Sequence, residues 1–285
     1  MPSTNPQPSW DLVIRPKTGW FDLHLNDLWR YRDLIGLFVW RDFAASFKQT
    51  ILGPAWFIIN PVVTTVTFTV VFGEIANIST DGLPKFLFYQ SGLTIWQYFS
   101  SCLSNTSNTF VGNAGIFGKV YFPRLVSPIS TVISGLFRFA IQYLVFLAFL
   151  LYFLVKGSDI HPNLWILATP LLLLLMAGMG LGAGIIISSM TTKYRDLSNL
   201  VGFGTSLLMY ASPIIYPASH ISDKYRWIIL ANPIAPVIEA FRYAYLGAGS
   251  FQPVYLLYTV AVTGLLLFAG VVLFSHVEKT FMDTV

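Results

Sequence analysis

Long runs of apolar residues, separated by short polar segments, dominate the chain from residue 51 onward. An α-helix needs about 20 predominantly apolar residues to cross the hydrocarbon core of a bilayer. Six runs meet this requirement, at residues 51–73, 86–111, 127–155, 164–190, 199–216 and 254–275. The pattern therefore predicts an all-α integral membrane protein with six transmembrane helices.

A mixed segment of aromatic and charged residues, 27–48, precedes the first run. Its longest uncharged run, residues 34–40, is too short to cross a bilayer. Helices of this composition lie in the membrane interface, with their apolar side among the lipid headgroups. We therefore expect an amphipathic interfacial helix here, and no cleavable signal peptide before it. The expected division is a cytoplasmic N-terminal segment, residues 1–50, a six-helix domain, residues 51–275, and a cytoplasmic tail, residues 276–285.

The connection between the last two predicted spans, residues 217–252, contains two short amphipathic segments. One lies around Trp227, and the other contains Glu239 and Arg242. Neither segment is long enough to cross the membrane. We expect both to form short extracytoplasmic helices that re-enter the membrane or lie on its outer surface as a gate.

Composition and charge agree with a membrane protein. Hydrophobic residues make up 55% of the chain and charged residues only 11%, whereas about 25% of the residues in a soluble domain are charged. With the N-terminus inside, eleven Lys and Arg residues fall on the cytoplasmic side and five on the opposite side. The positive-inside rule therefore predicts that both termini are cytoplasmic.

Several classes of function are disfavoured. The single cysteine, Cys102, and four scattered histidines offer neither a disulfide framework nor a metal site. Lys and Arg form no cluster that follows a phosphate backbone, so we expect no nucleic-acid partner. The interiors of the predicted spans contain no Asp or Glu. This argues against an ion-coupled transporter, which needs buried ionisable groups.

The Gly-rich segment 112–120 is the one stretch comparable to a phosphate-binding loop. That loop has the pattern G-x-x-x-x-G-K followed by Ser or Thr. Here Asn113 stands in place of the first glycine and Val120 in place of the hydroxyl residue. We therefore expect no nucleotide site and no cofactor in this chain.

Polar residues recur at steps of three and four in the second predicted span, which places them on one helix face. Polar and aromatic residues mix similarly in the first and fifth spans. Such faces suit a sugar conduit, because rings stack on sugars while amides and hydroxyls exchange hydrogen bonds with them. They also suit hydrogen bonds between membrane helices. The candidate channel residues are Trp56, Asn60, Thr94, Gln97, Ser101, Asn108, Phe203 and Tyr210.

Glycines and one arginine mark two further features of the spans. The fourth span contains overlapping small-x-x-x-small pairs, Gly178/Gly182 and Gly180/Gly184, which predict close packing against neighbouring helices. Arg138 lies inside the third span. An intramembrane arginine is either a functional group or a side chain that extends to the cytoplasmic headgroups. The sequence leaves both alternatives open.

These elements, in this order, resemble the membrane subunit of the type-2 ABC exporters, in particular the permeases for O-antigen and teichoic acid polysaccharides. The resemblance runs from about Trp29 to Phe281. Capsule-exporting relatives share the architecture, but the segment from Lys48 to Trp56 is more similar to the O-antigen type. The segments that carry the resemblance are Lys48-Gln-Thr-Ile-Leu-Gly-Pro-Ala-Trp, Asn113-Ala-Gly-Ile-Phe-Gly-Lys-Val-Tyr-Phe-Pro-Arg, Tyr194-Arg-Asp, Ser212-Pro-Ile-Ile-Tyr-Pro, Asn232-Pro, Glu239-Ala-Phe-Arg and Glu278-Lys-Thr-Phe.

The resemblance implies a homodimer in the plasma (inner) membrane of a bacterium, bound to two cytoplasmic ATPase subunits that hold ATP and Mg²⁺. The complex would export a polyprenyl-diphosphate-linked polysaccharide, so this chain would be a transport subunit and not an enzyme. The interfacial helix and the short cytoplasmic loops would contact the ATPase, and the segments after the fifth span would form the outer gate. The candidate residues are Arg41, Lys119, Arg124, Arg195 and Asp196 for ATPase coupling, and Trp227, Glu239 and Arg242 for the gate.

Two hypotheses from other classes stand beside this one. The first is a secondary transporter or flippase for lipid-linked glycans that acts without ATP, which the absence of carboxylates in the spans disfavours. The second is a membrane-embedded enzyme that modifies glycans. It is disfavoured because no loop combines paired carboxylates or a histidine cluster.

Overall fold

The computed structural model describes residues 25–47, 55–117, 119–120, 122–191, 194, 196–249 and 251–280. Within these residues the chain is helical apart from turns and connecting loops, which confirms the predicted all-α class. The helices are α1 (Leu25–Arg30), α2 (Arg32–Phe47), α3 (Trp56–Phe68), η2 (Thr69–Ile75), α4 (Lys85–Ser107), α5 (Thr109–Phe117), α6 (Val126–Val155), η3 (Leu164–Ala168), α7 (Thr169–Thr191), α8 (Leu197–Tyr210), η4 (Ala218–His220), α9 (Asp223–Ala231), α10 (Ala235–Leu246) and α11 (Pro253–Thr280).

Four of the six predicted spans are helices that are long and apolar enough to cross a membrane. They are α3 continued by η2, α6, η3 continued by α7, and α11. α4 is long enough, with 23 residues, but it carries a polar face. α8 has only 14 residues, a length of about 21 Å against a hydrocarbon core of about 30 Å.

The end of α8 explains why the fifth predicted span is short. Pro213 follows Ser212, and a proline keeps the preceding residue out of the helical conformation and donates no backbone hydrogen bond itself. Residues 211–216 therefore form turns. Asn232 fixes this region, because its Nδ2 donates to Ser212 Oγ at 2.8 Å and to the Ala211 carbonyl at 3.2 Å. The prediction of helix over residues 199–216 is wrong beyond Tyr210.

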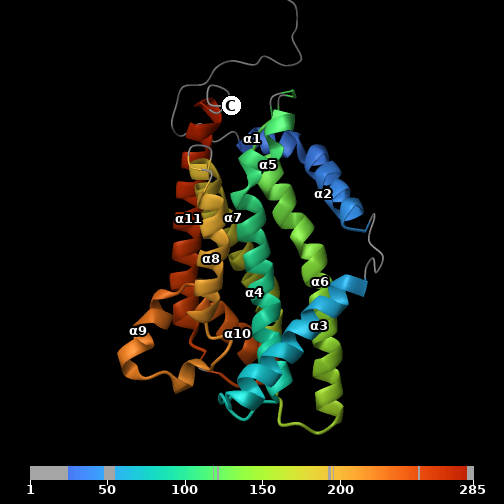
Figure 1. The fold of residues 1–285 in the computed structure, drawn as a ribbon, viewed down its shortest axis with the longest axis vertical. Coiled ribbons are helices and arrows are strands. Elements are labelled where there is room, and N and C mark those ends of the chain that lie inside the picture. Colours follow the sequence, from blue (N-terminus) through green and yellow to red (C-terminus); the bar gives the residue numbers. More distant parts are fainter. Residues whose placement is uncertain are drawn as a thin grey trace, which may run out of the picture.

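α7 packs against both α4 and α11 at the centre of the molecule (Figure 1). Gly180 and Gly184 face α4, and a Cβ added at Gly184 would lie 1.6 Å from Thr106 Oγ1. The Thr106 hydroxyl donates to the Gly180 carbonyl at 3.2 Å. Gly178 and Gly182 face α11. The close packing predicted from the glycines is therefore confirmed, and it uses two faces of one helix.

The segment predicted as an interfacial helix is helical, as α1 and α2, which are separated by a turn at Tyr31. α2 packs on α6, where the rings of Phe43 and Phe137 meet edge to face with centroids 4.5 Å apart. Trp29 and Trp40 are exposed. Apolar side chains therefore occupy both the packed and the exposed sides of this segment, and it is less clearly amphipathic than predicted.

The two short helices predicted between the last spans are present as α9 and α10. α10 is mostly buried, and it contacts α4, α7, α11 and η3. It ends at Gly247, whose φ of 75° favours glycine. A Cβ at this position would lie 2.6 Å from the His161 carbonyl oxygen. α10 is therefore packed inside the protein and does not lie on its surface.

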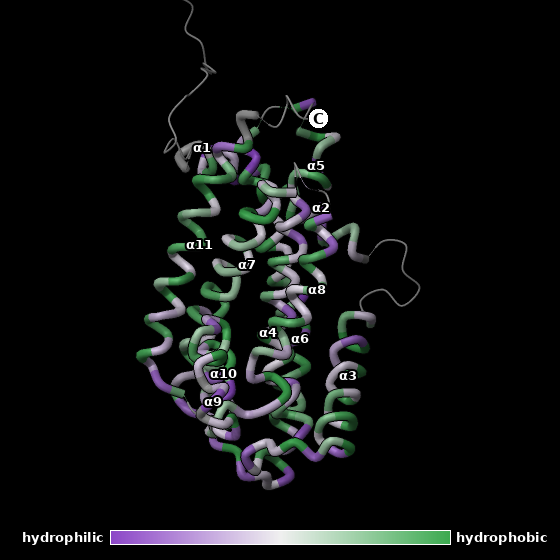
Figure 2. The backbone as a smooth tube through the Cα atoms, turned by 60° about the vertical axis from the view of Figure 1, so that its left-hand side comes forward, coloured by the Kyte–Doolittle hydropathy of each residue, from purple (hydrophilic) through white to green (hydrophobic). Residues whose placement is uncertain are grey.

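The two ends of the molecule carry different elements. α1, α5 and the last described turns of α11 lie at one end, while α9 and α10 lie toward the other (Figure 1). Hydrophilic positions gather at α1 and around α9, whereas α11 is mostly hydrophobic along its length (Figure 2). This distribution fits helices that cross an apolar layer with polar groups on both sides.

Candidate functional site

A polar groove opens on the side of the molecule between α2, α3, α4 and α6. It consists of two hollows, of about 500 Å³ and about 490 Å³. Phe57, Ser101, Gly135 and Arg138 line both hollows. The first hollow extends along α2 and the second along α3, so four helices distant in sequence contribute to one groove.

Four of the predicted channel residues converge on this groove. Trp56 and Asn60 come from α3, and Gln97 and Ser101 come from α4. An aromatic ring, two carboxamides and a hydroxyl therefore face the same space. These groups provide a stacking surface together with hydrogen-bond donors and acceptors.

The other predicted channel residues lie elsewhere. Thr94 is on the same face of α4 but is buried, and its hydroxyl donates to the Gln90 carbonyl at 2.7 Å. Asn108 is exposed at the end of α4. Phe203 and Tyr210 are exposed on α8 and line neither hollow. The groove as it stands in one chain therefore includes half of the predicted set.

A pair of glutamine side chains joins α4 to α6 at one end of the groove. Gln142 Nε2 donates to Gln97 Oε1. Gln97 is the groove residue of α4 nearest to the helix N-terminus, and Gln142 is the groove residue of α6 nearest to the C-terminus. Because the two helices run antiparallel (Figure 1), both mark the same end. The sequence shows that Arg138 and Gln142 are four residues apart and share one face of their helix. It does not show that this face meets α4.

Arg138 projects into the groove from α6, about 18 Å along the helix from Val126. Its Nη2 donates to Ser46 Oγ at 3.2 Å, and its guanidinium lies 5.7 Å from the centroid of the Phe57 ring. Arg138 thus contacts α2 and α3 as well. Of the two alternatives for this arginine, the geometry favours a functional group that faces the groove.

The C-terminal half of α2 is attached to α6 by polar side chains. Arg41 Nη2 lies 2.8 Å from Asp42 Oδ1, and Ser134 Oγ donates to Asp42 Oδ2 at 3.5 Å. Arg41, predicted to couple to the ATPase, lines the first hollow. Sequence reasoning did not single out Asp42 and Ser46. Their spacing of four residues on one helix face was the available signal.

Arg242 and Glu239, two of the predicted gate residues, form a buried ion pair. Arg242 Nη1 lies 2.8 Å from Glu239 Oε1, and the two side chains are 1% and 6% exposed. Arg242 Nη2 also donates to the Pro213 carbonyl at 2.9 Å, and its guanidinium lies 3.8 Å from the centroid of the Phe88 ring. Burial lowers the pKa of the Arg242 guanidinium, and the adjacent carboxylate acts in the opposite direction. The pair links α10 to α4 and to the turn after α8.

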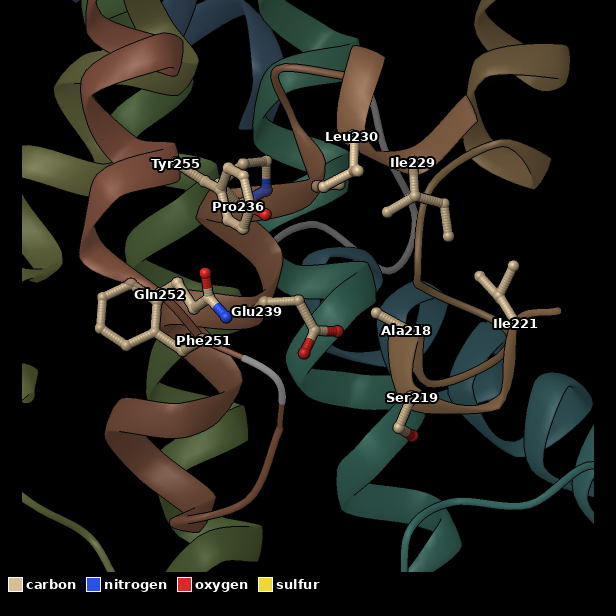
Figure 3. A pocket seen from close by; sticks show the side chains of 11 residues that line it. Ala218, Ser219, Ile221, Ile229, Leu230, Pro236, Glu239, Phe251, Gln252 and Tyr255 are labelled. Carbon is tan, nitrogen blue, oxygen red and sulfur yellow. The ribbon is translucent and has the colours of Figure 1, made fainter. Parts of the chain in front are cut away.

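A pocket of about 180 Å³ lies beside this pair, among η4, α9, α10 and the start of α11 (Figure 3). The Glu239 carboxylate projects into it toward Ala218 and Ser219 (Figure 3). Trp227, the third predicted gate residue, is exposed on α9 and does not line the pocket. α9 contributes Ile229 and Leu230 instead.

Three of the predicted coupling residues lie at the end of the molecule that carries α1 and α5 (Figure 1). Lys119 is exposed after α5, and Asp196 is exposed directly before α8. The Arg124 guanidinium lies 5.6 Å from the centroid of the Phe117 ring. Arg195 lies outside the described residues.

Helices that are long and apolar enough to cross a membrane pack beside a polar groove, an arrangement typical of membrane permeases. The chain belongs to the ABC-2 type transporter family, whose profile matches residues 33–246. It is 29% identical over 254 residues to the O-antigen export system permease protein RfbA of Klebsiella pneumoniae, with 88% of this chain and 94% of that protein covered.

Two further relatives support the comparison. The chain is 24% identical over 263 residues to the O-antigen export system permease protein RfbA of Myxococcus xanthus, with 92% of this chain and 98% of that protein covered. It is 25% identical over 247 residues to the polysialic acid transport protein KpsM of Escherichia coli, with 86% and 93% covered. The similarity therefore extends over most of the chain.

Proposed function

We propose that this chain is the transmembrane subunit of an ATP-driven exporter that moves an O-antigen-like, lipid-linked polysaccharide out of the bacterial cytoplasm. The observation that carries the proposal is the groove between α2, α3, α4 and α6, where groups suited to sugars meet. Membership of the ABC-2 type transporter family and the names of the relatives that align over most of the chain support it.

The groove residues would contact different parts of the substrate, according to their chemistry. Trp56 offers a ring for stacking on sugar rings, and the carboxamides of Asn60 and Gln97 both donate to and accept from sugar hydroxyls. Arg138 adds a positive charge with several donors, which suits the phosphates of a lipid diphosphate carrier. The groove is open at the side, so a lipid-anchored polymer has a route into it from the membrane.

The proposal includes six membrane crossings in the plasma membrane, with both termini cytoplasmic. α4 supplies a crossing despite its polar face, because most of its residues are buried against other helices and do not contact lipid. α8 and the turn after it supply another, with α10 enclosed near the outer face as a gate helix. α1, α5 and the end of α11 then lie on the cytoplasmic side.

The proposed assembly is a homodimer with two cytoplasmic ATPase subunits, which bind ATP and Mg²⁺. Of the candidate contacts that the structure describes, Lys119 and Asp196 are the strongest, because both are exposed on short connections at the proposed cytoplasmic end. A short connection transmits motion with little loss. Reversal of the charge at Asp196 would test this contact by its effect on ATPase binding.

A permease for capsule or teichoic acid is a second candidate, and the similarity to the polysialic acid transport protein KpsM favours it. It shares the architecture and differs in the polymer. Complementation separates the two candidates. The chain is expressed with its cognate ATPase in cells that lack the O-antigen permease and synthesise the matching polymer, and polysaccharide at the cell surface is measured.

Surface O-antigen that disappears when the ATP-binding lysine of the ATPase is replaced would support the proposal. Export of a capsule polymer in the matching capsule mutant, without export of O-antigen, would favour the second candidate. Export that continues with the inactive ATPase would identify a flippase that acts without ATP. Absence of export in both strains, with the protein present in the membrane, contradicts the proposal.

A further inference from the structure

The connection between η2 and α4 ends in a tight turn, at the end of the molecule that carries α9 (Figure 1). The Leu83 N–H donates to the Thr80 carbonyl at 3.1 Å across this turn. Its two central residues, Asp81 and Gly82, have φ of 53° and 77°, and turns with positive φ at both positions favour this pair of residues. Thr80 and Leu83 are each 6% exposed. These buried residues therefore hold Asp81 in a fixed position at the tip of the turn.

The Asp81 side chain contacts two residues of η4. Ser219 Oγ lies 2.7 Å from Asp81 Oδ2 and 3.0 Å from Oδ1, so the hydroxyl donates to this carboxylate. His220 Nδ1 lies 3.2 Å from Asp81 Oδ1. The side chains of His220 and Asp81 are 58% and 22% exposed, and polar contacts that water reaches are individually weak. The contact therefore joins two distant segments, yet little free energy is needed to break it.

η4 and α9 belong to a segment, residues 218–231, that packs only lightly on the rest of the molecule; we call it the flap. None of its described residues is buried, and within the described part of the chain α9 has no extensive contact with another helix. Pro217 and Asn232, on either side of the flap, are buried. The flap is therefore anchored at both ends and loosely packed between them.

The pocket of about 180 Å³ lies between the flap, α10 and the start of α11 (Figure 3). Ile221 of the flap lines it, and the Glu239 carboxylate of α10 projects toward Ser219 from the opposite side (Figure 3). Among the described side chains of the flap, only those of Ser219 and His220 make polar contacts with the rest of the chain, and both contact Asp81. Close packing does not hold the flap over this pocket, so the Asp81 contact is what fixes it there.

Asp81 also acts on the buried ion pair of α10. Burial lowers the pKa of the Arg242 guanidinium, and the charges of Glu239 and Asp81 act in the opposite direction. Because the effect of a charge falls with distance, the Asp81 carboxylate lies near this pair as well as near η4. One carboxylate on a fixed turn therefore faces both the flap and the helix on the other side of the pocket.

We propose that Asp81 is a positioning residue that latches the flap over the Glu239 pocket, and that this latch breaks and re-forms in each export cycle. The inference rests on the proposed function, which includes a gate at the outer face. The fold supplies the two parts that a latch needs, a fixed turn that presents the carboxylate and a loosely packed segment that the carboxylate restrains. Each copy of the proposed homodimer has its own latch, which acts on the flap and not on the polymer.

The first experiment locks the flap. Asp81→Cys and Ser219→Cys are combined in a Cys102→Ser chain that exports normally, so that these two thiols are the only ones. A short bis-thiosulfonate reagent bridges them from outside spheroplasts that also contain the cognate ATPase, and dithiothreitol releases them. We expect the bridge to abolish ATP-driven export and dithiothreitol to restore it. Each single-cysteine variant, treated in the same way, should keep exporting.

The second experiment opens the latch. Glycine adopts positive φ without strain, so Asp81→Gly removes the carboxylate and keeps the turn. Ala235 lines the pocket on α10 and is 2% exposed, so Ala235→Cys in the Cys102→Ser chain reports access to the pocket. We expect a membrane-impermeant thiol reagent to label this thiol about tenfold faster with Asp81→Gly than without it, the effect of one lost hydrogen bond to a charged group. Asn77→Gly, at the other described non-glycine residue with positive φ, is the control in the same loop.

The two experiments separate a latch from a structural contact. A latch predicts loss of export when the flap is bridged, but continued export at a nearly unchanged melting temperature when Asp81 is replaced by glycine. Continued export by the bridged protein would overturn the inference, and so would equal labelling rates with and without Asp81→Gly. A lower melting temperature of the Asp81→Gly chain with a matching loss of export would mark a structural role and overturn it as well. In all of these outcomes the wild-type chain exports, whereas its failure in complementation refutes the proposed function instead.

Discussion

Burial determines what the charged residues contribute to stability. The Arg242–Glu239 pair is 1% and 6% exposed, whereas the Lys85–Glu74 pair, with Nζ and Oε1 3.2 Å apart, is 34% and 61% exposed. Loss of one partner of a buried pair leaves an uncompensated charge and costs about 3–5 kcal/mol. An exposed pair contributes about 0–1 kcal/mol. The two pairs therefore form a matched comparison within one molecule.

We expect Glu239→Gln to destabilise the protein by several kcal/mol, on the order of 3, because it leaves the buried guanidinium of Arg242 without its carboxylate. Glu74→Gln, the control at the exposed pair, should change stability by less than about 1 kcal/mol. Thermal unfolding in detergent measures both. Equal melting temperatures for the two variants would show that the buried pair does not hold α10 in place.

Arg138 provides a second test at a single residue. Its side chain is exposed in the groove and, among the described residues, makes one side-chain hydrogen bond, to Ser46, so Arg138→Gln should leave the melting temperature nearly unchanged. We expect export to fall at least about tenfold, since hydrogen bonds to charged groups are worth about 1.5–3 kcal/mol. Arg32→Gln, at an exposed position on α2 outside the groove, is the control. Unchanged export by Arg138→Gln would favour the alternative that Arg138 extends to lipid headgroups.

The sequence predicted some groove residues and missed others for a common reason. Periodicity identifies which residues share a face of one helix, and it placed Gln97 and Ser101 together on α4. It does not identify the helix that the face meets. The pairing of Gln97 with Gln142, and the position of Asp42 beside α6, follow from tertiary packing alone.

At the scale of helices, hydropathy predicts the position of the most apolar helices, and it says less about how the protein encloses a helix with polar groups. α6 and α11 are apolar along most of their length and were predicted within a few residues. α4 is central and carries polar groups that its neighbours shield. α10 is mostly buried, whereas its sequence left open whether it re-enters the membrane or lies on the outer surface. Burial against other helices removes the requirement for an apolar sequence, so the sequence pattern cannot reveal it.

The contact between α7 and α4 depends on the absence of side chains on α7. A Cβ at Gly184 would lie 1.6 Å from Thr106 Oγ1 and 3.1 Å from the Leu103 carbonyl oxygen. Gly184→Ala should therefore force the helices apart and destabilise the protein by about 1–3 kcal/mol, as overpacking does. Gly264→Ala on α11, where an added Cβ meets nothing within 4 Å, is the control. A melting temperature unchanged by Gly184→Ala would show that this helix contact adjusts easily.

At the scale of the whole molecule, the distribution of charge predicts the orientation in the membrane. The end with α1 and α5 carries Lys119 and Arg124, and the opposite end includes the loop with Lys156 and the helix α9 with Lys224. From the eleven-to-five distribution of Lys and Arg, we expect the first end to be cytoplasmic. The sequence thus predicted the sidedness that the proposed transport direction requires, although it did not predict how the helices enclose the groove.

Cysteine labelling tests this orientation directly. Lys119 is exposed just after α5, and Lys156 is exposed just after the C-terminal end of α6. These two helix ends lie at opposite ends of the molecule (Figure 1), so Lys119→Cys and Lys156→Cys in a Cys102→Ser chain report the two sides separately. A membrane-impermeant thiol reagent added to spheroplasts should label the chain with Lys156→Cys, and should label the chain with Lys119→Cys only after the membrane is opened. The Cys102→Ser chain itself contains no cysteine and serves as the blank. Labelling at position 119 in closed spheroplasts would place α5 outside the cell, and ATPase contacts at that end would then be impossible.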